Sequence, residues 1–122
     1  MNLFKNLFKK TNKLEEIKKG NQKYESYFLN NEDFLKECKT GLFYSIVRIK
    51  GEIYELEVQL DEVCGEDYDN FICYINDTEI KGLNNFLNYD LGNNTYLKDL
   101  TTIEFIEYNN TDPKKYFVDG II

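Results

Sequence analysis

The densest group of chemically active side chains in this sequence is a run of carboxylates between residues 52 and 69. It places eight acids in eighteen positions with no lysine or arginine among them: Glu52, Glu55, Glu57, Asp61, Glu62, Glu66, Asp67 and Asp69. Carboxylates at this density can attract a cationic surface, bind a divalent cation, or exchange protons with a substrate. The first chemistry needs only exposure, whereas the other two need a defined spacing.

The spacing of the acids does not match the calcium-binding loop of an EF-hand. A loop that begins at Asp67 needs acids or Asn at its third and fifth positions and glycine at its sixth. Asp69 is the third residue, but Phe71 and Ile72 are the fifth and sixth. We therefore expect no metal or other cofactor, with an irregular weak divalent site left as an alternative.

Residue types that are missing exclude most enzyme classes. The chain has no histidine, and its seven glycines are scattered singly, so catalytic His arrangements and phosphate-binding glycine loops are absent. Cys38, Cys64 and Cys73 form neither a CxxC pair nor an even set, which argues against a zinc site and a complete disulfide framework. Cys73 lies in an apolar run and is expected to be buried, whereas Cys64 is expected near the surface. We predict a non-enzymatic protein, although Glu55 and Glu57 could in principle act as a general acid and base.

Charge is divided unevenly along the chain. Residues 1–40 carry a net charge of +3 and residues 41–122 one of −10, which together give −7. An acidic surface repels nucleic acid phosphates and speeds association with a basic protein. We therefore expect no direct nucleic acid binding by the acidic body and a basic protein as its partner.

The basic N-terminus has the pattern of a short amphipathic helix. Residues 1–10, MNLFKNLFKK, place two Leu and two Phe on one helical face and lysines on the other. Residues 1–11 could contact a membrane surface or a partner, but one or two turns bind membranes weakly, so packing on the domain is favoured. No apolar stretch has the ~18 residues of a spanning helix and no signal-peptide pattern is present, so we expect a cytoplasmic protein.

The spacing of apolar residues predicts helices followed by strands. Apolar positions at intervals of three and four predict a helix over 13–29, and an acidic first turn predicts a second over 32–39. From residue 42 the period changes to two, and a two-residue turn at Lys50-Gly51 would pair residues 43 with 58, 45 with 56, 47 with 54 and 49 with 52.

This hairpin would have two different faces. One is apolar and is expected in the core: Phe43, Val47, Tyr54, Leu56 and Val58. The other is mixed: Tyr44, Ile46, Arg48, Ile53, Glu55, Glu57 and Gln59. A mixed face is either partly solvated or a partner-binding surface, and the sequence leaves these two interpretations even.

The rest of the chain predicts three more strands, over 71–76, 102–108 and 116–122, with a short helix around Leu83 and Phe86. We expect an α+β fold in which N-terminal helices pack on one face of a mainly antiparallel sheet of about four to five strands. The chain would form a single domain, 1–122, with a helical part over 1–40 and a mainly strand part over 41–122.

One stretch resembles a known family. In residues 74–100, INDTEIKGLNNFL followed by YDLGNNTYLKDL resembles the strand, turn and helix before a Tyr-Gly-Asn segment in barstar-type ribonuclease inhibitors. The similarity covers less than a quarter of the chain and lacks the tryptophan of that family. We infer neither fold nor site residues from it.

These observations predict a non-enzymatic acidic inhibitor, such as a bacterial immunity protein that masks the positive site of a basic toxin or nuclease. The residues expected to bind the partner are Glu55, Glu57, Asp61, Glu62, Glu66, Asp67, Tyr68 and Asp69. Tyr68 is the favoured aromatic anchor because aromatic residues concentrate interface energy. A phage-encoded inhibitor of a host nuclease and a peripheral membrane or scaffold module are the alternatives.

Overall fold

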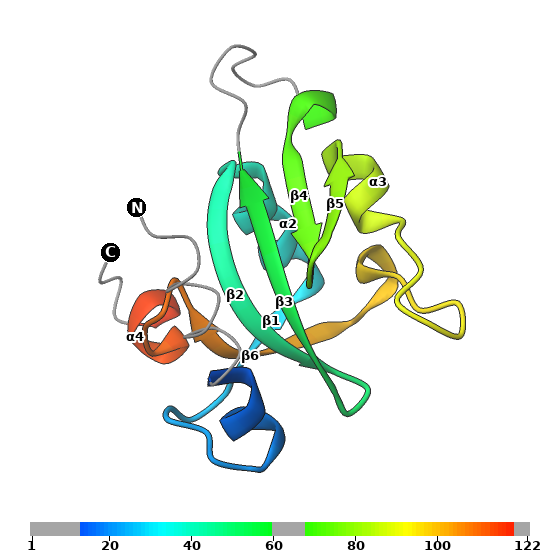
Figure 1. Ribbon diagram of the computed structural model, residues 1–122. Coiled ribbons are helices and arrows are strands. Elements are labelled where there is room, and N and C mark those ends of the chain that lie inside the picture. Colours follow the sequence, from blue (N-terminus) through cyan, green and yellow to red (C-terminus); the bar gives the residue numbers. More distant parts are fainter. Residues whose placement is uncertain (1–12, 60–67, 119–122) are drawn as a thin grey trace, which may run out of the picture.

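The computed structural model describes residues 13–59 and 68–118, and its centre is a six-stranded antiparallel sheet (Figure 1). The strands lie in the order β1-β6-β2-β3-β4-β5. Their bounds are β1 Tyr27–Asn30, β2 Leu42–Ile49, β3 Glu52–Gln59, β4 Ile72–Ile75, β5 Thr78–Lys81 and β6 Thr102–Tyr108. The expected α+β class and antiparallel sheet are confirmed, but the sheet has more strands than the expected four to five.

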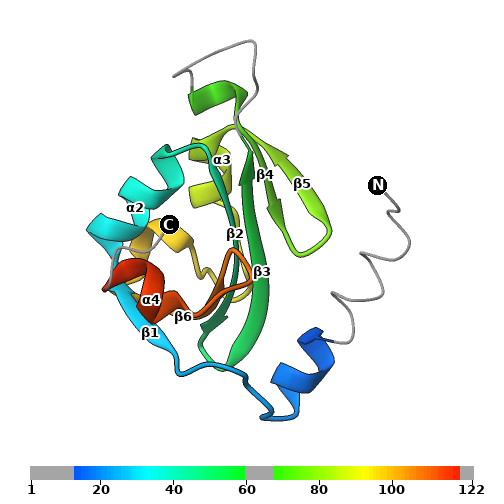
Figure 2. The same cartoon turned by 90° about the vertical axis from the view of Figure 1, so that its left-hand side faces the viewer.

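Short helices lie between the strands instead of gathering at the N-terminus, so the expected arrangement of the helices is wrong. They are α2 (Asn31–Lys39), α3 (Leu83–Leu87), α4 (Pro113–Phe117) and a helical segment at residues 13–18, with 3-10 turns η1 (Tyr68–Asn70) and η2 (Leu97–Asp99). Figure 2 shows α2, α3 and α4 on one side of the sheet and the helix at 13–18 on the other. Both faces of the sheet are therefore partly covered, not one.

The main core lies between the sheet and the helices α2, α3 and α4. Its largest side chains include Phe34 of α2, Phe43 of β2, Phe86 of α3 and Phe105 of β6, all nearly or fully buried. A smaller cluster on the opposite face joins Ile17 to two other isoleucines, Ile46 and Ile106. The two clusters give the sheet two unequal packed faces.

The predicted β2–β3 hairpin is confirmed residue for residue. Phe43 pairs with Val58, and the register continues to Ile49 opposite Glu52. Lys50 and Gly51 form the turn with φ angles of 50° and 83°, the left-handed values that two-residue hairpin turns require. This register places the expected core face against the main core and the expected mixed face on the other side of the sheet, where Ile46 is fully buried beneath Ile17.

The helix predicted over 13–29 is wrong beyond residue 18. Gly20 has a φ of 92°, and its N–H donates to the Ile17 carbonyl at 3.0 Å while the Asn21 N–H donates to the Glu16 carbonyl at 2.9 Å. This pair of hydrogen bonds is the Schellman motif that ends helices at glycine. Tyr27, Phe28 and Leu29 belong instead to β1, and Phe28 is 61% exposed on this edge strand.

The fifth strand expected over 116–122 is also wrong, because α4 occupies residues 113–117. Asp112 caps this helix by accepting a hydrogen bond from the Lys114 N–H, and Pro113 occupies its first turn. Residues 119–122 lie outside the described part of the chain. A strand that was not expected, β5, pairs with β4 through the turn at Asn76.

A bulge in β6 explains why its sequence alternates imperfectly. Ile46 pairs with Glu107 while Val47 pairs with Phe105, so Ile106 is the additional residue. Glu107 is consequently on the mixed face, where its side chain is 4% exposed and forms an ion pair with Lys13 Nζ at 3.1 Å. This ion pair holds the helix at 13–18 against the sheet.

Candidate protein-binding surface

A line of alternating tyrosines and carboxylates crosses four neighbouring strands on the face opposite α2 and α3. Tyr44 pairs with Glu57, Glu57 pairs with Tyr74, and Tyr74 pairs with Glu79. These four residues are called here the Tyr–Glu row. Antiparallel pairing puts directly opposed side chains on the same face, so the register alone places the four groups side by side.

Hydrogen bonds fix two carboxylates at this row. The Tyr44 hydroxyl donates to Glu55 Oε2 at 2.7 Å, and the Tyr74 hydroxyl donates to Glu79 Oε1 at 3.0 Å. Burial, followed by the bond to Glu55, raises the pKa of Tyr44 far above its usual value. The bond to Glu79 is the largest cause of the raised pKa of Tyr74. Both tyrosines are protonated donors at neutral pH, as tyrosine ordinarily is, and each holds one oxygen of its carboxylate partner in place.

The surface around the row carries uncompensated negative charge. In the described part of the chain Glu55, Glu57 and Glu79 have no ion-pair partner, whereas Glu107 pairs with Lys13 and Glu104 pairs with Arg48. The next set of cross-strand pairs beside the Tyr–Glu row contains one cation, Lys81, which pairs with Ile72. Three carboxylates against one lysine leave this part of the sheet anionic.

Coverage of this face is uneven. The helix at 13–18 packs over β2 and β6 through Ile17, with Tyr44 and Ile53 at the margin of that contact. The helix that contacts β4 and β5, α3, packs from the other side of the sheet (Figure 2). Tyr74 is half-buried and Glu79 is exposed, so the β4–β5 end of the row is accessible.

The structure brings together only some of the residues that the sequence predicted to bind a partner. Glu55 and Glu57 lie on the face of the Tyr–Glu row. Four others, Asp61, Glu62, Glu66 and Asp67, lie outside the described residues, as do Cys64 and the amphipathic segment 1–11.

Tyr68 and Asp69 lie in η1, away from the row. The Tyr68 ring is 40% exposed and packs edge-on against Phe71 with 5.3 Å between ring centroids. Lys39 Nζ of α2 lies 5.8 Å from the centroid of the same ring. Because Phe71 and α2 belong to the main-core side, Tyr68 is an exposed aromatic residue on a different side of the molecule from Glu57.

Sequence reasoning missed Glu79 and the role of Tyr74. Because β5 was not predicted, no residue was expected opposite Tyr74. The available signal was the Asn76-Asp77 turn, since a two-residue turn there pairs residue 75 with 78 and 74 with 79.

The described residues contain neither a candidate metal site nor a candidate membrane span. Within residues 13–59 and 68–118, no three His, Cys, Asp or Glu side chains are grouped so that they could hold a metal ion. The helices in the same ranges include none that is long and apolar enough to cross a membrane.

Comparison with protein-family models, with curated proteins and with solved structures found no match to this chain.

Proposed function

We propose that this protein is a non-enzymatic inhibitor that binds a basic protein, such as a toxin or nuclease, through the Tyr–Glu row. The observation that carries the proposal is the register Tyr44–Glu57–Tyr74–Glu79, with Glu55 beside it. It presents aromatic rings and oriented carboxylates together on a rigid sheet.

The chemistry of the row suits lysine and arginine side chains. Carboxylates form strong charge-assisted hydrogen bonds with guanidinium and ammonium groups, and tyrosines supply contact area at low entropic cost. A carboxylate that a tyrosine already holds loses less conformational freedom when it binds. The same charges repel phosphates, so a basic protein is a better ligand for this surface than nucleic acid.

The acidic segment 61–69 would add long-range attraction in this proposal. Its five acids, Asp61, Glu62, Glu66, Asp67 and Asp69, would increase the rate of encounter with a basic partner, whether or not each one touches it. Tyr68 would then belong to a second, separate contact.

The proposal can be tested by capture from the lysate of the source cells at low and at high salt, with the retained proteins identified by mass spectrometry. The test variant is Glu57→Gln with Glu79→Gln. Its control is Glu25→Gln with Glu32→Gln, which removes the same charge from exposed positions elsewhere. We expect one basic protein near one-to-one stoichiometry, associating roughly five- to ten-fold more slowly with the test variant at low salt.

Each outcome distinguishes the classes of function. Inhibition of the captured protein would support the proposal. A toxin made by the same organism would indicate an immunity protein, and a nuclease of a phage host would indicate a phage-encoded inhibitor. Equal binding by the two charge variants would contradict the assignment to the Tyr–Glu row. Retention of anionic lipid alone, lost on removal of residues 1–11, would favour the membrane or scaffold module instead.

A further inference from the structure

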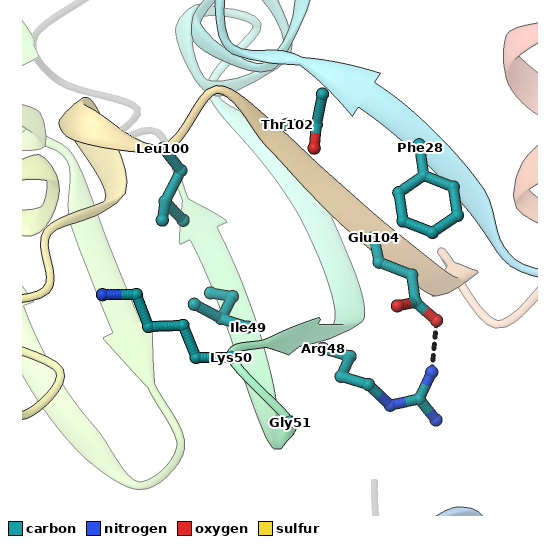
Figure 3. A pocket seen from close by; sticks show the side chains of 8 residues that line it. All are labelled: Phe28, Arg48, Ile49, Lys50, Gly51, Leu100, Thr102 and Glu104. Carbon is teal, nitrogen blue, oxygen red and sulfur yellow. Dashed lines mark hydrogen bonds and ion pairs between the residues drawn. The ribbon is translucent and has the colours of Figure 1, made fainter.

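A pocket of about 250 Å³ opens where β2 and β6 diverge at one end of the sheet (Figure 3). The last paired residues of these two strands are Arg48 and Glu104. Beyond them β2 continues into its turn with β3, while β6 continues beside β1. The space between the strands is bordered by side chains from β1, β2 and β6 and from the segment before β6.

The pocket combines apolar surface with an excess of positive charge. Phe28 of β1 is 61% exposed beside it, and Leu100 borders the other side. A large aromatic side chain left this exposed beside a hollow is available to cover an apolar ligand.

The two cations of the pocket differ in their ion-pair and hydrogen-bond partners. Arg48 forms an ion pair with Glu104, and its other terminal nitrogen donates to Gln22 Oε1 at 3.3 Å. The Lys50 amine donates to the Thr95 hydroxyl at 3.0 Å, and it has no carboxylate partner among the residues that the structure describes. In Figure 3 the Lys50 amine lies on the Leu100 side and the Arg48 guanidinium on the Phe28 side. Lys50 therefore supplies the available positive charge.

We propose that this pocket binds an apolar group that carries an adjacent carboxylate. The apolar group would lie between Phe28 and Leu100, and the carboxylate would accept a hydrogen bond from Lys50. The volume is below that of the usual drug-sized site, which begins at roughly 300 Å³, so a group the size of one side chain fits. Such a group occurs in small aryl and aliphatic acids and at the carboxyl terminus of a peptide that ends in an apolar residue.

This site is independent of the proposed inhibitor function, because its charge preference is the reverse of that of the Tyr–Glu row. The row attracts cations and lies across β2 to β5, whereas the pocket attracts an anion and lies between β1, β6 and the β2–β3 turn. Failure of one assignment leaves the other standing.

The test is a titration of the isotope-labelled protein followed by NMR, with phenylacetate as probe and neutral phenylacetamide as its match. We expect phenylacetate to shift amide signals of Lys50, Thr102 and their neighbours with a dissociation constant on the order of millimolar, as ligands of this size give. Lys50→Asn should weaken binding about three- to ten-fold. Asparagine favours the left-handed turn conformation, so this variant keeps the hairpin.

Two further variants complete the design. Phe28→Ser should weaken binding of both probes, and Lys114→Gln, which removes a lysine from α4, should change neither. Equal affinity for the two probes, equal loss in the two lysine variants, or no shifts around the pocket at 20 mM phenylacetate would each overturn the proposal.

A peptide arm identifies the source of the ligand. The ligand is a peptide terminus if acetyl-Gly-Gly-Phe with a free carboxylate binds more tightly than phenylacetate and the same peptide with an amidated C-terminus does not. If the peptide binds less tightly than phenylacetate, the ligand is a small acid.

Discussion

Two buried thiols should make the stability of this protein fall in mildly alkaline solution. Cys38 of α2 and Cys73 of β4 are both fully buried in the main core. Burial raises the pKa of Cys73 to about 12. Burial, then the neighbouring Cys73, raises the pKa of Cys38 well above the usual value of 9.0. The folded protein therefore keeps two thiol protons that the unfolded chain releases above pH 9.

The sign and size of the effect follow from proton linkage. Since the folded state binds more protons than the unfolded state above pH 9, the free energy of unfolding is undiminished below that pH and falls above it. At pH 9.5 each thiol lowers it by about 0.8 kcal/mol, and the two together by about 1.7 kcal/mol. Tyr44 and Tyr108, whose pKa values burial also raises, begin to act only near pH 10 and add about 0.3 kcal/mol.

Urea unfolding at pH 7.5 and 9.5 measures this difference. The wild-type protein should lose about 2 kcal/mol between the two conditions, and Cys38→Ala or Cys73→Ala should each lose about 0.8 kcal/mol less than wild type. Cys64 is present in all three proteins and cancels in the comparison. A wild-type loss below about 0.5 kcal/mol, or equal losses in wild type and both variants, would refute the reasoning.

Three further predictions concern single positions and are measured by urea unfolding at pH 7.5. Ser45→Ala should raise the free energy of unfolding by about 1 kcal/mol, because the buried Ser45 hydroxyl has no hydrogen-bond partner among the described residues. A lower free energy of unfolding would show that the hydroxyl does form a hydrogen bond. Asn30→Ala should lower it by about 1 kcal/mol, because Asn30 caps α2 by accepting from the Asp33 N–H at 2.8 Å; no change would mean that the cap contributes nothing. Gly82→Ala should lower it by about 1–2 kcal/mol, since Gly82 has a φ of 92° and a Cβ there would lie 3.3 Å from the Asp69 carbonyl oxygen. Gly51→Ala is the control, because Gly51 also has a positive φ but its Cβ would meet nothing within 4 Å. A larger loss at Gly82 than at Gly51 therefore measures the cost of the close contact.

Local patterns predicted the hairpin and β6 but not the longer arrangement of the sheet. Alternation and a two-residue turn determine the β2–β3 register, because one slipped residue would turn Phe43 and Leu56 outward. The pairing of β1 with β6 joins Tyr27 to Phe105, a contact between distant parts of the chain that no local pattern encodes. In the 13–29 segment the spacing of apolar residues correctly predicted a helix as far as Ile17, but the helix ends before Gly20 although the spacing continues.

The candidate surface was only partly predicted, because local patterns gave the hairpin but not every strand that pairs with it. Glu55 and Glu57 are on the predicted hairpin, so their face could be read from the sequence. Glu79 belongs to a four-residue strand with one apolar residue, Ile80, which is too little for a periodic signal. The Asp112-Pro113 pair is typical of a turn and also of a helix start, and the contact of Phe117 with Phe105, with 5.4 Å between ring centroids, is one of the α4 packing contacts that the local pattern alone does not show.

The position of β6 in the sheet determines when this chain can complete its fold during synthesis. β6 follows every other strand in sequence, yet it lies between β1 and β2. Until the ribosome has released residue 108, β1 has no neighbouring strand and Phe34 lacks its contact with Phe105, whose ring centroid lies 6.2 Å away. The β2–β5 meander can form earlier, but its core face stays incomplete. Folding should therefore finish in one late, slow step that inserts β6, because pairing β6 with β1 closes the longest loop between any two paired strands of the described sheet.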